Sequence, residues 1–187
     1  MALERVEIEQ VTDIFAAAKL EPFRSYEDAM IYLQQSAVRA NVKHLSYWFL
    51  QFKDDLPEQV IWVSTYDANY MRRYMSKFTP MGDPVLSALE GERIVDWLEW
   101  LPYDEVSQQM YAIAKEYDIP KYGVSLQFPV ERFDKFVFSA CLESNDADWL
   151  QTRSALVKRF KPFAKEFHKR VAPMIAANEI GTAVYSF

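Results

Sequence analysis

Glycine, cysteine and positive charge are all scarce in this chain. Its 187 residues include only four glycines, too few for a glycine-rich loop that cradles a nucleotide phosphate. The single cysteine, Cys141, excludes an internal disulfide and a zinc site built on thiolates, and its apolar surroundings favour a buried, inert thiol. Acidic residues outnumber basic ones by 27 to 21, and this net charge of −6 argues against a surface that grips DNA or RNA.

Long hydrophobic runs are missing as well. No apolar stretch approaches the roughly 18 residues of a membrane-spanning helix, and the first residues, MALERVE, do not resemble a signal peptide. We therefore expect a cytoplasmic protein with no membrane partner. Half of the residues are apolar, so a sizeable core can form in one domain. We expect this domain to span residues 1–177, with 178–187 as a C-terminal tail or the start of a linker.

Apolar periodicity predicts two helices and then a hairpin of strands in the first third of the chain. The first helix is expected over 6–20. The second begins after Ser25, whose hydroxyl can cap the first turn near Asp28. Aromatic and β-branched residues predict strands over 42–52 and 60–64. The turn between them, over 53–57, is short, so the two strands should pair antiparallel.

Helices and strands continue to alternate in the rest of the chain. We predict a helix over 67–78, a short helix opening at 83–85, a short strand or extended segment over 94–97, a helix over 104–117, strands over 122–130 and 135–142, and a long helix over 147–177. Hairpin neighbours favour an antiparallel sheet with helices on its faces, which is an α+β domain.

The long last helix carries three notable patterns. Its apolar stripe is expected at Leu150, Leu156, Phe160, Phe163, Phe167, Val171 and Met174. Pro162 and Pro173 lie inside it and should kink or break it. Its basic residues are Arg153, Lys158, Arg159, Lys161, Lys165, Lys169 and Arg170. Because glutamates and phenylalanines alternate with them, a solvated helix face is favoured over a DNA or phosphate site.

A dense set of polar aromatic residues precedes an isolated carboxylate. Tyr66, Tyr70 and Tyr74 are followed by Asp83, which stands next to Pro84. An aspartate in this position commonly caps the next turn, accepting backbone N–H bonds. If the carboxylate instead faces an apolar pocket, it needs a donor such as the amide N–H of a ligand. Aromatic walls with a few convergent polar groups suit a small amphiphilic ligand.

Each aromatic and hydroxyl group of this set also has a structural interpretation. The three tyrosines and Trp97 can be ordinary core rings, and Ser139, inside an apolar strand, can be satisfied by the backbone. Three tyrosines on one helical segment favour a polar ligand, because each buried hydroxyl must find a partner.

The order and spacing of these residues resemble the acyl-homoserine lactone binding signature of LuxR-type quorum-sensing regulators. The matching run is Tyr66-x3-Tyr70-x3-Tyr74-x8-Asp83-Pro84-Val85, followed by Trp97. Gly123 and Ser139 also match family positions, and the predicted order of elements agrees over roughly residues 5–175. The resemblance implies an α/β/α sandwich around a five-stranded antiparallel sheet.

The resemblance also implies a role for each polar residue of the signature. Asp83 would accept the amide N–H of the ligand. Tyr66 would donate to the acyl carbonyl, helped by the hydroxyl of Ser139. The family usually has tryptophan where this chain has Tyr70, whose hydroxyl can still donate one hydrogen bond but lies elsewhere. A non-lactone signal is therefore an alternative to the acyl-homoserine lactone.

Packing roles follow from the resemblance in the same way. Tyr74 and Trp97 would pack on the acyl chain and the lactone ring. Pro84 and Gly123 would shape the backbone around the pocket, and Val85 belongs to the same motif.

The resemblance implies a sensor domain without enzymatic activity, metal or cofactor. We expect a homodimer that reaches DNA only through a C-terminal helix-turn-helix, which the ten residues after Ala177 are too short to form. Either the DNA-binding domain lies outside this chain, or the protein is a stand-alone signal binder or anti-activator.

Two further alternatives stay open. One is a small enzyme with Asp83 as general base, although His44 and His168 have no evident catalytic or metal partners. The other is a structural interaction module that binds no ligand.

Overall fold

The structure, a computed structural model, describes residues 21–53, 56–77, 83–87, 91–100, 105–131 and 134–177. The helix predicted over 6–20 lies outside these residues, as do Phe78 and the tail 178–187.

A five-stranded antiparallel sheet forms the middle layer of the domain. Its strands are β1 (His44–Lys53), β2 (Leu56–Ser64), β3 (Arg93–Asp96), β4 (Gly123–Pro129) and β5 (Lys135–Cys141). They lie in the order β2-β1-β5-β4-β3, and every neighbouring pair is antiparallel. The predicted hairpin is confirmed, but β2 begins earlier than predicted, because Leu56 and Pro57 already pair with β1.

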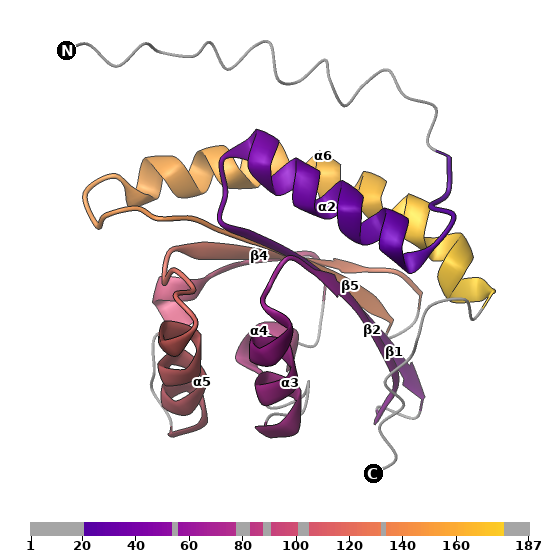
Figure 1. Cartoon of the computed structure of the whole chain (residues 1–187), viewed down its shortest axis with the longest axis horizontal. Helices are drawn as coiled ribbons and strands as arrows, with labels where there is room; N and C mark the ends of the chain where they lie inside the picture. The colour runs from indigo at the N-terminus through magenta and orange to yellow at the C-terminus, as the bar shows by residue number, and fades with distance from the viewer. Residues whose placement is uncertain are drawn as a thin grey trace.

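Helices cover both faces of the sheet (Figure 1). α2 (Tyr26–Ala40) and α6 (Trp149–Ala176) lie on one face. The other face carries α3 (Ala68–Lys77), α4 (Pro84–Ser87) and α5 (Glu105–Glu116). A 3₁₀ helix, η3 (Trp97–Trp100), follows β3, so Trp97 stands outside the short strand predicted over 94–97. The predicted α+β class and the α/β/α sandwich are confirmed.

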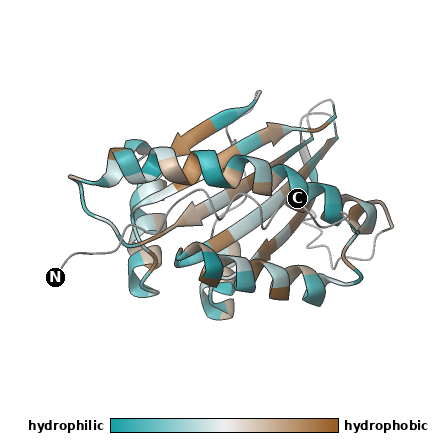
Figure 2. Cartoon of the chain, turned by 90° about the horizontal axis from the view of Figure 1, so that it is seen from above, coloured by the Kyte–Doolittle hydropathy of each residue, from teal (hydrophilic) through white to brown (hydrophobic). Residues whose placement is uncertain are grey.

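The two faces of the sheet pack two separate cores. Alternate side chains of a strand point to opposite faces. Phe136 and Phe138 of β5 join the core under α2 and α6, whereas Val137 joins the core facing α3, α4 and α5. Figure 2 shows hydrophobic residues along the strands and many hydrophilic residues on the helices above them. The core on the α2 and α6 side is the larger.

The start of α2 has the predicted cap. The Ser25 hydroxyl accepts the backbone N–H of Asp28 at 3.1 Å. The helix ends at Asn41, whose φ of 51° is in the left-handed region that favours a helix stop.

α6 corrects two predictions. It continues through Pro162 and Pro173, so a break at these prolines is wrong. Burial of one face along the whole helix, including Phe160 and Phe167, opposes the cost of the missing backbone bonds. Leu150 does not belong to the buried stripe, because 71% of it is exposed; Trp149, only 3% exposed, takes that place.

Several basic residues of α6 contact the rest of the domain. Arg153 forms ion pairs with Asp96 and Glu99 at 3.4 Å. Arg159 donates to the carbonyl of Ala40 at 2.9 Å, and Arg170 donates to that of Glu21 at 2.9 Å. These contacts tie α6 to β3, to η3, to the end of α2 and to the segment before α2, which favours a structural role for them. No described helix is long and apolar enough to cross a membrane.

Candidate ligand-binding site

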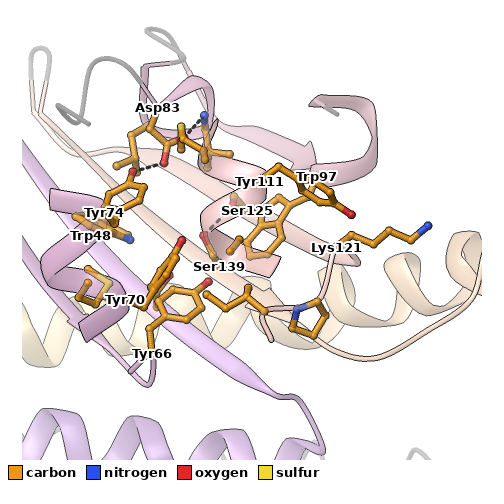
Figure 3. Close-up of a pocket in the computed structure, with 18 of the residues that line it drawn as sticks. Trp48, Tyr66, Tyr70, Tyr74, Asp83, Trp97, Tyr111, Lys121, Ser125 and Ser139 are labelled. Carbon is orange, nitrogen blue, oxygen red and sulfur yellow. Dashed lines mark hydrogen bonds between the residues drawn. The ribbon is translucent and has the colours of Figure 1, made fainter. Parts of the chain in front are cut away.

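A cavity of about 160 Å³ lies between the sheet and the helices α3, α4 and α5. Figure 3 shows side chains from strands, helices and the loop before β4 converging on it. Seven of the nine predicted site residues line it: Tyr66, Tyr70, Tyr74, Asp83, Val85, Trp97 and Ser139. Gly123 stands behind Trp97 rather than on the wall. The backbone of Pro84 begins α4, as predicted.

Asp83 is both a helix cap and a wall of the cavity. One carboxylate oxygen, Oδ1, accepts the backbone N–H of Val85 at 2.7 Å, and the backbone carbonyl accepts that of Leu86 at 3.0 Å. The other oxygen, Oδ2, accepts the hydroxyl of Tyr74. Only 8% of Asp83 is exposed, and this burial raises the pKa of the carboxyl despite the bonds that the carboxylate accepts from Tyr74 and Val85. Asp83 thus caps the next turn, as predicted, and also lies on the cavity wall.

The three tyrosines form a row beside Asp83. Ring centroids are 5.3 Å apart between Tyr66 and Tyr70, and 6.0 Å apart between Tyr70 and Tyr74. Burial raises the pKa of each phenol, so all three are protonated donors at neutral pH. Tyr66 is not on the helix, contrary to the prediction, because Asp67 caps α3 through the N–H groups of Asn69 and Tyr70.

The Tyr70 hydroxyl has a distinct environment in this row. The Tyr74 hydroxyl is already bonded to Asp83, and Ser46 lies within hydrogen-bonding reach of the Tyr66 phenol. The Tyr70 hydroxyl has no hydrogen-bond partner among the described residues, and its side chain lines the cavity. Figure 3 shows this hydroxyl directed toward the side of the cavity that holds Asp83 and Tyr74.

A chain of hydrogen bonds crosses the opposite wall. The indole N–H of Trp97 donates to Ser125 Oγ at 2.8 Å. Ser125 Oγ lies 2.7 Å from Ser139 Oγ. Ser139 is thus paired with a side chain, not with the backbone. A Cβ atom at Gly123 would overlap the Trp97 ring, so the glycine lets this ring lie against β4.

Sequence reasoning missed Ser125 and the wall supplied by α5 and the loop after it. The missed lining residues include Ser46, Trp48, Met110, Tyr111, Lys121 and Ser125. Strand alternation offered a signal for Ser125, which stands two residues after Gly123 and on the same face. No comparable signal existed for α5, since only the tertiary fold decides which face of that helix meets the sheet.

The histidines are not part of the cavity wall, but the His44 ring contacts Tyr66 of that wall, with 4.9 Å between ring centroids. His168 Nδ1 is 2.8 Å from the Tyr47 hydroxyl, and burial lowers the pKa of its imidazole to about 4. His44 Nδ1 is 3.3 Å from the carbonyl of Thr65. Neither lines the cavity. Among the described residues, no cluster of His, Cys, Asp and Glu could hold a metal ion. Cys141 is buried, as predicted.

Comparison with known proteins identifies the family. The model of the autoinducer binding domain matches residues 25–171, and the chain belongs to this family. No curated protein sequence matches the chain.

Solved structures show the same fold. The N-acylhomoserine lactone dependent LuxR family transcription factor CepR2 of Burkholderia cenocepacia is similar with a TM-score of 0.59 at 14% identity, over 90% of this chain and 97% of that one. Escherichia coli SdiA is similar with a TM-score of 0.59 at 11% sequence identity, over 96% of this chain and 69% of that one. The structure of SdiA in complex with octanoyl-rac-glycerol has a TM-score of 0.53 at 12% sequence identity, over 96% of this chain and 68% of that one. The resemblance to LuxR-type regulators found in the sequence is confirmed.

Proposed function

We propose that this domain senses an N-acyl-homoserine lactone, or a related acylated signal, bound in the cavity between the sheet and α3, α4 and α5. The observation that carries the proposal is the buried Asp83 carboxylate on the wall of a cavity lined by aromatic rings. A role in signal binding is what membership of the autoinducer-binding family supports.

The polar groups of the cavity match an acylated amide. A carboxylate offers about four acceptor positions, and Tyr74, through its hydroxyl, and Val85, through its N–H, use two of those on Asp83. The remaining positions can accept an amide N–H from the ligand. The Tyr66 and Tyr70 phenols supply donors for carbonyl oxygens. We propose that Asp83 binds the amide and that the two phenols bind the carbonyl groups beside it.

The residues of the cavity define the head group of the signal less well than they define its acyl amide. Tyr70 replaces the tryptophan usual in the family, which favours keeping non-lactone signals as a second candidate. The structure of SdiA with octanoyl-rac-glycerol supports this breadth, because an acylglycerol carries an acyl chain without a lactone. We therefore include an acylglycerol among the ligands to be tested.

The cavity volume favours a short acyl chain. At about 160 Å³ it is close to engineered protein cavities that hold one benzene molecule, and it is smaller than pockets for drug-sized ligands. A butanoyl or hexanoyl chain needs less rearrangement of α3 and α5 than a dodecanoyl chain. We propose that affinity for acyl-homoserine lactones falls as the chain becomes long.

Ligand-induced stabilisation tests the proposal. We expect saturating N-hexanoyl-homoserine lactone to raise the melting temperature by about 5 to 10 °C, as expected for a ligand at about a hundred times its Kd. Asp83→Asn should remove most of this rise, because the amide nitrogen of asparagine can replace an acceptor with a donor. The matched control is Asp28→Asn, at an exposed position on α2.

Four outcomes distinguish the candidate functions. A rise in wild type that Asp83→Asn abolishes supports the proposed amide contact. A response to octanoylglycerol but to no lactone supports the non-lactone alternative. No response to butanoyl, hexanoyl, octanoyl or dodecanoyl lactones or to octanoylglycerol would contradict the proposal and favour the interaction module. The enzyme alternative predicts ring-opened or deacylated lactone in a mass spectrum after incubation.

The assembly and the boundaries predicted from the sequence stay predictions. We propose a homodimer, which light scattering of the ligand-bound protein can test. We also propose that residues 1–177 form the ligand-binding unit and that DNA is reached only through a separate domain.

A further inference from the structure

Three side chains from three different elements form one line of hydrogen bonds along the wall of the cavity. Trp97 belongs to η3, Ser125 to β4 and Ser139 to β5. The indole Nε1 of Trp97 is 2.8 Å from Ser125 Oγ, which is 2.7 Å from Ser139 Oγ. Ser125 is 1% exposed and Ser139 is 4% exposed. We call this line the hydroxyl relay.

The chemistry of its first member fixes the direction of the first bond of the relay. An indole N–H can only donate, so Ser125 accepts from Trp97. The buried Ser125 hydroxyl then needs an acceptor for its own hydrogen, and Ser139 Oγ is its other side-chain partner among the described residues. Either hydroxyl of the serine pair can be the donor, and the one that accepts keeps its own hydrogen for another partner. Ser139 is the more exposed of the two cavity-lining serines, so the order from Trp97 through Ser125 to Ser139 leaves this hydrogen where it is better placed to meet a ligand.

The relay leaves one hydrogen available at its end. Ser139 accepts from Ser125, and its own hydroxyl hydrogen has no further partner among the described residues. Ser139 lines the cavity. Hydrogen bonds in a chain polarise one another, so this last hydroxyl is a stronger and better oriented donor than an isolated serine.

The backbone at Gly123 holds the first member of the relay in place. The Trp97 ring occupies the space in which a Cβ atom at Gly123 would stand. Ser125 follows two residues later and points to the same face of β4. The glycine thus allows the indole to lie close enough to the strand for its N–H to reach Ser125.

We propose that Trp97 and Ser125 are positioning residues that fix the Ser139 hydroxyl as a donor toward a carbonyl oxygen of the ligand. This inference rests on the proposed function and deepens it. It requires the signal to present a hydrogen-bond acceptor at Ser139, because a methylene group there would leave a buried donor unsatisfied. It also gives Trp97 a polar role in addition to packing on the ligand.

A double-mutant cycle tests this indirect role. Affinity for N-hexanoyl-homoserine lactone is measured by calorimetry for wild type, Ser125→Ala, Ser139→Ala and the double variant. We expect each single variant to bind about tenfold more weakly, the size of one lost hydrogen bond. The double variant should bind no more weakly than Ser139→Ala, because Ser125 acts only through Ser139.

Further variants separate positioning from a general structural effect. Ser125→Thr keeps the hydroxyl and should restore most of the affinity. Trp97→Phe keeps a ring but removes the N–H, and it should weaken binding more in wild type than in the Ser139→Ala background, where only the loss of packing on the ligand remains. Ser64→Ala, on the same face of the sheet and outside the cavity wall, should leave affinity unchanged.

The outcomes distinguish this inference from the proposed function. If wild type binds and the effects of Ser125→Ala and Ser139→Ala add, or if Ser125→Ala has no effect, the inference is overturned while the sensor function stands. Non-additive losses with rescue by threonine support it. If wild type binds neither the lactones nor octanoylglycerol, the proposed function fails and the inference fails with it.

Discussion

Asp83 combines a role in the fold with a place on the cavity wall. Its Oδ1 caps α4 through the N–H of Val85, and its Oδ2 accepts the Tyr74 hydroxyl. These bonds fix the carboxylate in a buried position and offset part of the cost of removing its charge from water. A ligand amide would supply a further donor to the same group.

Tyr70 is the residue that most limits the identity of the ligand. Tyr70→Trp restores the side chain usual in the family and should strengthen binding of N-hexanoyl-homoserine lactone about tenfold, because an indole N–H can reach the lactone carbonyl. Tyr70→Phe is the matched control, since it removes only the hydroxyl. Calorimetry of the three proteins checks this, and weaker binding by Tyr70→Trp would favour a head group other than the lactone.

His168 couples stability to pH. In the folded protein the pKa of its imidazole is about 4, below the ordinary value of 6.5 that applies to the unfolded chain, because burial disfavours the charged ring. Between these values the unfolded chain binds more protons, so the free energy of unfolding falls as the pH falls from about 6.5 to about 4. We expect the stability advantage of wild type over His168→Gln to be complete above pH 6.5 and to shrink toward pH 4. Denaturant unfolding across this range measures it, and a constant difference would contradict the assignment.

At the scale of elements, capping residues and buried faces determine where each helix begins and how far it continues. α2 begins where the sequence predicts because the Ser25 cap is a local interaction. α6 continues through two prolines because its buried face is held against the sheet along its length. A local capping residue therefore predicts the start of a helix well. A proline predicts the interruption of a helix less well when one face of that helix is packed along its whole length.

The cap of α2 gives a prediction for this scale. Ser25→Ala should lower the free energy of unfolding by about 1 kcal/mol, because the N–H of Asp28 loses its acceptor. Ser154→Ala is the control. It lies inside α6 on an exposed position, where alanine favours the helix, so no loss of stability is expected. Equal losses in both variants, measured by urea unfolding, would contradict the role of the cap.

At the scale of the whole molecule, the sheet separates a filled core from a face that holds a cavity. The side with α2 and α6 is filled by interlocking rings such as Tyr47, Phe138 and Phe167. The other side keeps a cavity among Tyr70, Asp83 and their neighbours. A ligand that fills this cavity completes the second core, so we expect binding and stability to be coupled.

Much of this arrangement could be predicted from the sequence. The aromatic and β-branched residues over 42–52 predicted β1, and the spacing from Tyr66 to Asp83 predicted most of one cavity wall. Ser125 could not be found in this way, because its role depends on Trp97 reaching it from another element. The exposed position of Leu150 likewise depends on where α6 meets the sheet.

Native mass spectrometry of the full chain, expressed with and without N-hexanoyl-homoserine lactone in the medium, shows whether this domain binds an acylated signal. We expect the protein to retain one intact lactone per chain, and Asp83→Asn, expressed in the same way, to retain much less. Intact wild-type protein that carries no acylated ligand after growth with the lactone panel and octanoylglycerol, or that converts the lactone to a ring-opened product, would contradict this expectation.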